Sequence, residues 1–156
     1  MSSLDRVAPT PLGETIIHIL AAGIAAQIVF EILALLIAPL VLGLPMLPAN
    51  FVVALTALAG LSLPISAGWA GHLLAGIVVF PVGYMLMRRF LNNWGWALAG
   101  ALYGIVLWFI AQGFLAPLVG RPFMLGFVSY TWVSLVAHLI YALTIAYVID
   151  RLQRRL

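Results

Sequence analysis

Residues 15–42 read TIIHILAAGIAAQIVFEILALLIAPLVL, and the only charged residue among them is Glu31. The hydrocarbon core of a bilayer, about 30 Å thick, is crossed by roughly 20 apolar residues in a helix. This run is longer than the apolar core of a signal peptide and lacks the two-residue alternation of a membrane strand. It therefore predicts a membrane-spanning helix, and the rest of the chain is interpreted around it.

The composition of the whole chain agrees with this interpretation. Of 156 residues, 65% are apolar and 7% are charged, and the mean hydropathy is +1.21. A soluble domain is about 45–50% apolar and about 25% charged, so a water-soluble globule is excluded. The absence of cysteine excludes disulfides and thiolate metal sites. We expect an all-α integral membrane protein, a single domain over residues 1–156 in contact with the lipid bilayer.

Three further runs are long enough to cross a membrane, at residues 66–87, 96–119 and 130–149. The apolar stretch 51–61 is too short, since it opens after Asn50 and closes at Pro64. We expect it to form a short interfacial or re-entrant helix. The four spans together predict a four-helix bundle.

The arginines decide between four and five spans, because positive charge accumulates in cytoplasmic segments. With four spans, every arginine except Arg121 lies on one side: Arg6, Arg88, Arg89, Arg151, Arg154 and Arg155. Five spans would divide these arginines between the two sides. We therefore predict four spans with both termini cytoplasmic. Because the basic residues bracket apolar runs and form no patch with exposed aromatics, no nucleic-acid partner is expected.

The chain also repeats itself. Ala38-Pro39-Leu40-Val41 recurs as Ala116-Pro117-Leu118-Val119, and His72-Leu73 recurs as His138-Leu139. A double arginine follows each histidine by sixteen residues, which places the two histidines at one depth, about 24 Å from the arginines. This pattern predicts two duplicated parallel hairpins related by a pseudo-two-fold axis along the membrane normal.

Polar side chains interrupt all four predicted spans, although each costs several kcal/mol in lipid unless it is paired or faces the bundle interior. Gln27 and Glu31 stand four residues apart and share one face of the first span. Glycines at four-residue steps, Gly68 and Gly76 around His72, permit close approach of a neighbouring backbone or a flat ligand. The remaining members of this polar layer are His72, Gln112, Ser134, His138 and Tyr141.

Several hypotheses account for this layer. Two histidines at matched depth suit the axial ligands of a b-type haem, with His72 and His138 binding the iron. Glu31, His72 and His138 together are a possible ligand set for a divalent metal. The same three residues suit a proton or substrate path in a small oligomeric transporter or channel. The alternative without a ligand is a buried hydrogen-bond layer that fixes helix register or the contact with a partner subunit.

Gly71-His72, Gly76, Gly83-Tyr84 and His138-Leu139-Ile140-Tyr141, the last after a Pro-Leu-Val-Gly loop, form a pattern that resembles small four-helix bacterial inner-membrane proteins of uncharacterised function. The resemblance covers most of the chain. It implies a four-helix fold and an inner-membrane location, and it implies no activity and no catalytic residue.

The sequence thus favours an intrinsic accessory or cofactor-holding subunit of a larger membrane assembly, such as an electron-transfer complex, or of a homo-oligomer. Haem b is the sharpest version of this hypothesis, and the small transporter is the alternative. A hydrolytic enzyme comes last, because no nucleophile stands at a recognisable spacing from a base.

Overall fold

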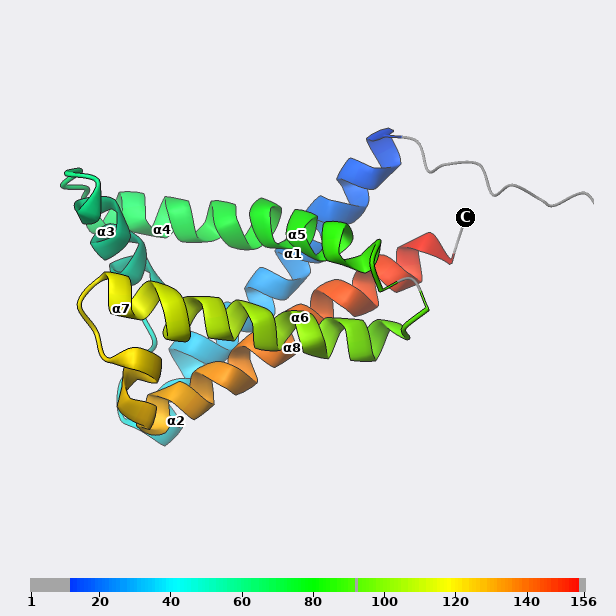
Figure 1. Ribbon diagram of the computed structural model, residues 1–156. Helices are drawn as coiled ribbons and strands as arrows, with labels where there is room; N and C mark the ends of the chain where they lie inside the picture. The colour runs from blue at the N-terminus through cyan, green and yellow to red at the C-terminus, as the bar shows by residue number, and fades with distance from the viewer. Residues whose placement is uncertain (1–11, 92, 155–156) are drawn as a thin grey trace, which may run out of the picture.

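The computed structural model describes residues 12–91 and 93–154, which fold into helices joined by short turns, with no strand in these ranges (Figure 1). Four helical stretches are long and apolar enough to cross a membrane: Leu12–Leu42, Ile65–Arg88, Trp96–Leu118 and Ser129–Gln153. The predicted four-helix architecture is confirmed. The largest boundary difference is at the C-terminal end of the last span, at Gln153 instead of residue 149. Arg6 and Arg155, used in the charge argument, lie outside the described residues.

The short apolar stretch after the first span forms α3 (Pro48–Leu58), which begins and ends three residues earlier than predicted. Pro48 begins the helix because proline is favoured in a first turn, where its missing N–H costs nothing. Gly60, with φ +76°, follows its end. A Cβ on Gly68 would lie 2.5 Å from the Ala49 carbonyl oxygen, so α3 packs backbone to backbone against the second span.

Three of the four spans contain a π-helical segment, while the fourth, α8 (Ser129–Gln153), is α-helical throughout. The first span consists of α1 (Leu12–Ile32), η1 (Leu33–Ile37) and α2 (Ala38–Leu42). The second consists of α4 (Ile65–Leu74), η2 (Ala75–Val79) and α5 (Phe80–Arg88). The third consists of α6 (Trp96–Phe109), η3 (Ile110–Leu115) and α7 (Ala116–Leu118).

A proline explains each π segment, as the second span shows. The N–H of Phe80, just before Pro81, bonds five residues back to the Ala75 carbonyl. The Gly76 carbonyl would then need the N–H of residue 81, which proline lacks. The Tyr141 hydroxyl donates to it instead, at 2.5 Å. Pro81 thus follows a π segment whose free carbonyl is satisfied by another helix.

The first span repeats this arrangement. Ala38, just before Pro39, donates its N–H to the Leu33 carbonyl. The Ala34 carbonyl is left without an intrahelical donor, and it accepts the Met46 N–H at 2.9 Å. The bond ties the loop after α2 back onto the span.

The offset that aligns Ala38 with Ala116 also aligns the π segments of the first and third spans, because residues 33–37 then correspond to residues 111–115. Under the same offset Met46 corresponds to Met124, and both are buried. The first and third spans therefore share these features, whereas the second span has a π segment and α8 has none, and the duplication of whole hairpins stays a prediction.

The spans pack through small residues. α8 lies along both α1 and α6, and η2 packs against α1. A Cβ on Gly104 would lie 2.9 Å from the His138 carbonyl oxygen, and one on Gly23 would overlap the Ile77 carbonyl. The predicted role of such glycines in close backbone approach is therefore confirmed at these helix contacts.

The outer faces of the spans carry large exposed apolar side chains, including Ile17, Ile24 and Ile28 on α1 and Val136 on α8. Water does not solvate such a surface favourably, so the outer faces fit contact with a lipid bilayer. In Figure 1 the start of α1 and the end of α8 lie at one end of the bundle, together with the turn between α5 and α6. The opposite end carries α3 and α7, and we call it the α3 end.

Candidate functional site

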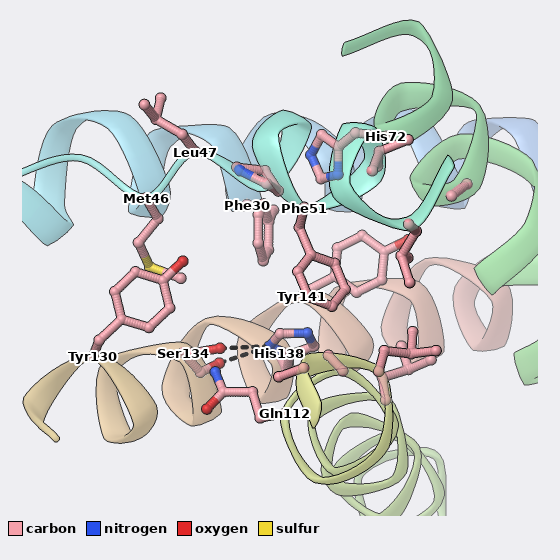
Figure 2. Close-up of a pocket in the computed structure, with 18 of the residues that line it drawn as sticks. Phe30, Met46, Leu47, Phe51, His72, Gln112, Tyr130, Ser134, His138 and Tyr141 are labelled. Carbon is pink, nitrogen blue, oxygen red and sulfur yellow. Dashed lines mark hydrogen bonds between the residues drawn. The ribbon is translucent and has the colours of Figure 1, made fainter. Parts of the chain in front are cut away.

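A cavity of about 250 Å³ lies between the spans towards the α3 end, and α3 contributes to its wall (Figure 2). Most of its lining is apolar, including Phe30, Phe51, Phe80, Leu107, Ala111 and Leu115. All four spans supply lining residues. Six of the seven polar-layer residues line it: Gln27, His72, Gln112, Ser134, His138 and Tyr141.

His138 presents one free ring nitrogen in this site. Its Nδ1 lies 2.7 Å from the Ser134 carbonyl oxygen and 3.3 Å from the Ser134 hydroxyl (Figure 2). A carbonyl oxygen only accepts, so Nδ1 carries the proton in this bond. In the neutral ring Nε2 is then an acceptor, and no hydrogen bond to it occurs within residues 12–91 and 93–154. His138 therefore offers an acceptor to whatever enters the cavity.

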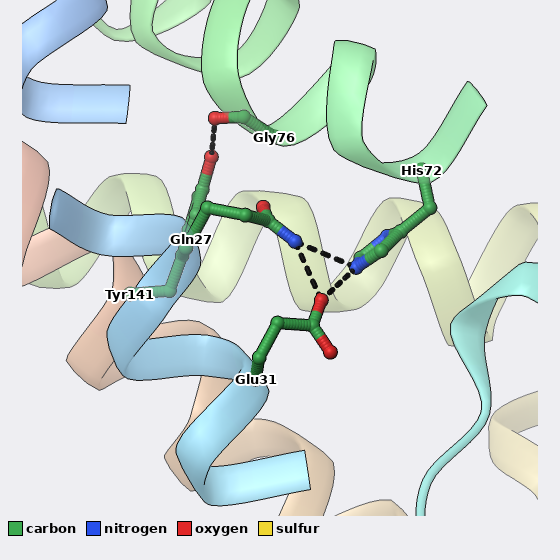
Figure 3. Close-up of polar contacts among 5 residues, drawn as sticks. All are labelled: Gln27, Glu31, His72, Gly76 and Tyr141. Atoms are coloured by element: carbon green, nitrogen blue, oxygen red, sulfur yellow. Dashed lines mark hydrogen bonds and ion pairs between the residues drawn. The ribbon is translucent and has the colours of Figure 1, made fainter. Parts of the chain in front are cut away.

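The second histidine belongs to a closed triangle of polar side chains. Glu31 Oε1 lies 2.7 Å from both Gln27 Nε2 and His72 Nε2, and the two nitrogens are 2.8 Å apart (Figure 3). Gln27 and Glu31, four residues apart on α1, both contact His72 of α4. Gly76 makes this approach feasible, because a Cβ there would overlap Gln27 Oε1.

The triangle has two alternative hydrogen-bond arrangements. His72 Nε2 either donates a proton to the Glu31 carboxylate or accepts one from the Gln27 amide, since a single ring nitrogen cannot do both. The arrangements differ in the position of one proton. Glu31 Oε2 is buried and has no hydrogen-bond partner in the described part of the chain, so this acidic group is incompletely satisfied.

Phe30 separates the two histidines. Its ring centroid lies 5.7 Å from the ring centroid of His72 and 5.9 Å from that of His138. It also contacts Tyr141 edge to face, at 5.9 Å. Sequence reasoning missed Phe30, although it continues a buried stripe along the first span at four-residue steps: Ala22, Ala26, Ala34 and Ala38.

The polar layer thus divides into two groups. One is the triangle of Gln27, Glu31 and His72, and the other is the pair Ser134–His138 across the cavity from it. Gln112 is 5% exposed, lines the cavity, and has a buried Oε1 with no partner in the described residues. The Tyr141 hydroxyl donates a hydrogen bond to the Gly76 carbonyl and so links α8 to η2.

The predicted metal ligands are not brought together. Glu31 and His72 meet, but His138 stands on the far side of Phe30. Among residues 12–91 and 93–154, no three His, Asp or Glu side chains lie close enough to hold a metal ion.

The turn before α8 borders the cavity at the α3 end and has a strained backbone. Met124 and Leu125 have φ of 50° and 51°, a left-handed conformation that residues other than glycine rarely adopt. The Thr131 hydroxyl donates to the Met124 carbonyl at 2.7 Å and helps to hold this conformation. Strain of this kind concentrates at functional sites, and here it points Leu125 into the cavity wall.

Two more rim residues, Arg121 and Tyr130, were missed as part of a site. In the sequence Arg121 served only to count the spans and Tyr130 was not singled out, yet both line the cavity. One signal pointed to Arg121: it is the only charged residue between Arg89 and Asp150.

The chain belongs to a family of unknown function, DUF6789, whose pattern matches residues 14–156. This agrees with the resemblance to uncharacterised proteins noted from the sequence. No curated protein and no solved structure matches the chain.

Proposed function

We propose that this member of a family without known function binds a small lipophilic molecule in the cavity between its four spans. The observation that carries the proposal is the cavity itself, about 250 Å³ of mostly apolar space inside an otherwise closely packed bundle. Ligand sites are typically concave, apolar and provided with a few polar groups that orient the ligand. The cavity has this character.

Its size indicates the scale of the ligand. A cavity of about 150 Å³ accommodates one benzene ring, so this one suits a two-ring molecule or a short acyl chain. An empty cavity of this volume would cost several kcal/mol in lost packing. That cost is a large part of a typical stability of about 5–15 kcal/mol, and a bound apolar molecule offsets it.

Binding of haem b by His72 and His138 would require the side chains around the two histidines to rearrange. His72 Nε2 is already within 2.8 Å of Gln27 and 2.7 Å of Glu31, and Phe30 contacts both imidazoles. Axial ligation by His72 and His138 would require Phe30 to leave and the triangle to open. The arrangement of these side chains therefore suits a ligand smaller than haem. An oxidised-minus-reduced spectrum tests haem directly, since a Soret band lost in both His72→Ala and His138→Ala would establish it.

Octan-1-ol tests the proposed function, because it combines a short apolar chain with one hydroxyl. We expect it to raise the melting temperature of the protein in maltoside detergent, as any ligand of the folded state does. Ala111→Phe fills the cavity and should abolish this increase. Ala97→Phe, on the exposed face of the same span, is the matched control and should retain it. An equal increase in all three proteins would place octan-1-ol outside the cavity and overturn the proposal.

The triangle of Gln27, Glu31 and His72 favours a second candidate function, a proton path in a small oligomeric transporter. A carboxyl group and an imidazole that share one proton inside a membrane are typical of proton relays. Glu31→Gln keeps the side-chain shape and removes the ionisable carboxyl group. If the path exists, this variant should abolish proton flux in proteoliposomes loaded with a pH-sensitive dye. A flux equal to that of the unchanged protein would remove Glu31 from it.

A further inference from the structure

Arg121 occupies the junction between two hollows at the α3 end. It lines the central cavity and also a more open hollow beside it, bordered by Leu44, Asn50 and Val128. Tyr130 lies in the wall of both hollows as well. The guanidinium carbon of Arg121 lies 5.6 Å from the ring centroid of Phe51, another residue of the cavity wall. The charge therefore lies at the mouth of an apolar chamber.

This charge has no acidic counterpart nearby. No Asp, Glu, Lys or Arg occurs between Glu31 and Arg88, and Arg121 is the only one between Arg89 and Asp150. The ion pairs in the described residues are Glu31–His72 and Asp150–Arg154, and neither includes Arg121. The α3 end thus carries one uncompensated positive charge, where an anion would be attracted.

We propose that the ligand of the cavity is a single-chain amphiphile with an anionic headgroup, carboxylate or phosphate, held by Arg121. This inference rests on the proposed function and specifies the class of ligand. The planar guanidinium matches the oxygens of both headgroups with two parallel N–H donors. The apolar chain lies in the cavity among Phe30, Leu107 and Ala111, where its burial stabilises the complex.

Three probes with the same eight-carbon chain test the role of the headgroup: octanoate, octyl phosphate and octan-1-ol. Their dissociation constants are measured at pH 8 in uncharged maltoside micelles, where octanoate is ionised. We expect both anions to bind about tenfold more tightly than the alcohol, because a charge-assisted bond is stronger than a neutral one. Tighter binding of octanoate identifies a fatty acid as the source of the headgroup, and tighter binding of octyl phosphate identifies a phospholipid-type phosphate.

Arg121→Gln should abolish the preference of the protein for the two anions over octan-1-ol. Arg151→Gln is the matched control, because Arg151 also lies over an aromatic ring, 5.0 Å from the centroid of Tyr147, but on α8 near the opposite end. It should keep the preference. Equal affinity for anion and alcohol in the unchanged protein, or a preference that survives Arg121→Gln, would overturn the inference.

The two proposals fail in different ways. If octan-1-ol binds in the cavity but the anions bind no better, the ligand is neutral and only the Arg121 inference is lost. If octan-1-ol does not bind while octanoate binds through Arg121, the anion site stands and the apolar cavity is not what holds the chain.

Discussion

At Gly76, which has no side chain, η2 is in contact with both α1 and α8. Gln27 of α1 occupies the position that a Cβ would take, and Tyr141 of α8 bonds to the Gly76 carbonyl (Figure 3). The four-residue step from His72 to Gly76 shows in the sequence that this face is crowded. Which neighbours crowd it depends on how the helices are rotated about their axes, and one sequence does not determine that. For the same reason the sequence places Glu31, His72 and His138 at similar depth without showing that Phe30 lies between the histidines.

Gly76→Ala should lower the free energy of unfolding by about 1–3 kcal/mol, because the new methyl group displaces Gln27 and opens the contact between α1 and η2. Thermal unfolding in mild detergent measures the change. Gly13→Ala is the control, since a Cβ there meets nothing within 4 Å. It should be neutral or slightly stabilising. Equal losses in the two variants would contradict the packing described at Gly76.

Tyr141→Phe removes only the hydroxyl that bonds to the Gly76 carbonyl. A buried carbonyl left without a donor costs about 1–3 kcal/mol, and we expect a loss of unfolding free energy in that range. Tyr147→Phe, at an exposed tyrosine, should have little effect. The same thermal unfolding assay compares them, and a Tyr141→Phe protein as stable as the unchanged one would show that the bond contributes nothing.

At the scale of elements, prolines account for the irregular parts of the spans. Pro39, Pro81 and Pro117 each follow a π segment. The prolines are visible in the sequence, and a kink at Pro81 is predictable from its missing N–H. The π register is not predictable, because it depends on donors from elsewhere in the fold, the Met46 N–H and the Tyr141 hydroxyl. The span boundaries are predictable within a few residues because apolar runs and their flanking residues are local signals.

Pro81→Ala should rescue Tyr141→Phe, because the restored N–H of residue 81 can donate to the Gly76 carbonyl. In a double-mutant cycle the loss caused by Tyr141→Phe should be smaller in the Pro81→Ala background. If the changes in unfolding free energy caused by Tyr141→Phe and by Pro81→Ala simply add, the Tyr141 hydroxyl does not take the place of the N–H that proline lacks.

At the scale of the whole molecule, the fold is a bundle whose two ends differ in charge. In the described part of the chain, Arg121 is the only basic residue at the α3 end, whereas Arg88 and Arg89 lie at the end of α5 and Asp150, Arg151 and Arg154 lie at the end of α8. The sequence predicts this asymmetry, because a span count and a charge count suffice for it. It does not predict the cavity, which exists only where spans distant in the sequence fail to fill the space between them.

The chain contains no cysteine, so single cysteines can report the topology without background. Ser66→Cys, at the start of α4, and Gln153→Cys, at the end of α8, are both exposed and lie at opposite ends. In intact cells, an impermeant maleimide should label only Ser66→Cys, and Gln153→Cys should react only after permeabilisation. Labelling of both from the same side would contradict four spans with cytoplasmic termini.

The proposed function depends on an apolar cavity between the packed spans that is large enough for a ligand. A crystal structure of the protein under xenon pressure tests it most directly, because xenon enters apolar cavities. We expect density, from xenon or from a retained lipophilic molecule, in contact with Phe30, Leu107 and Ala111. Spans packed together at these residues, with density only on the lipid-facing surface, would contradict it.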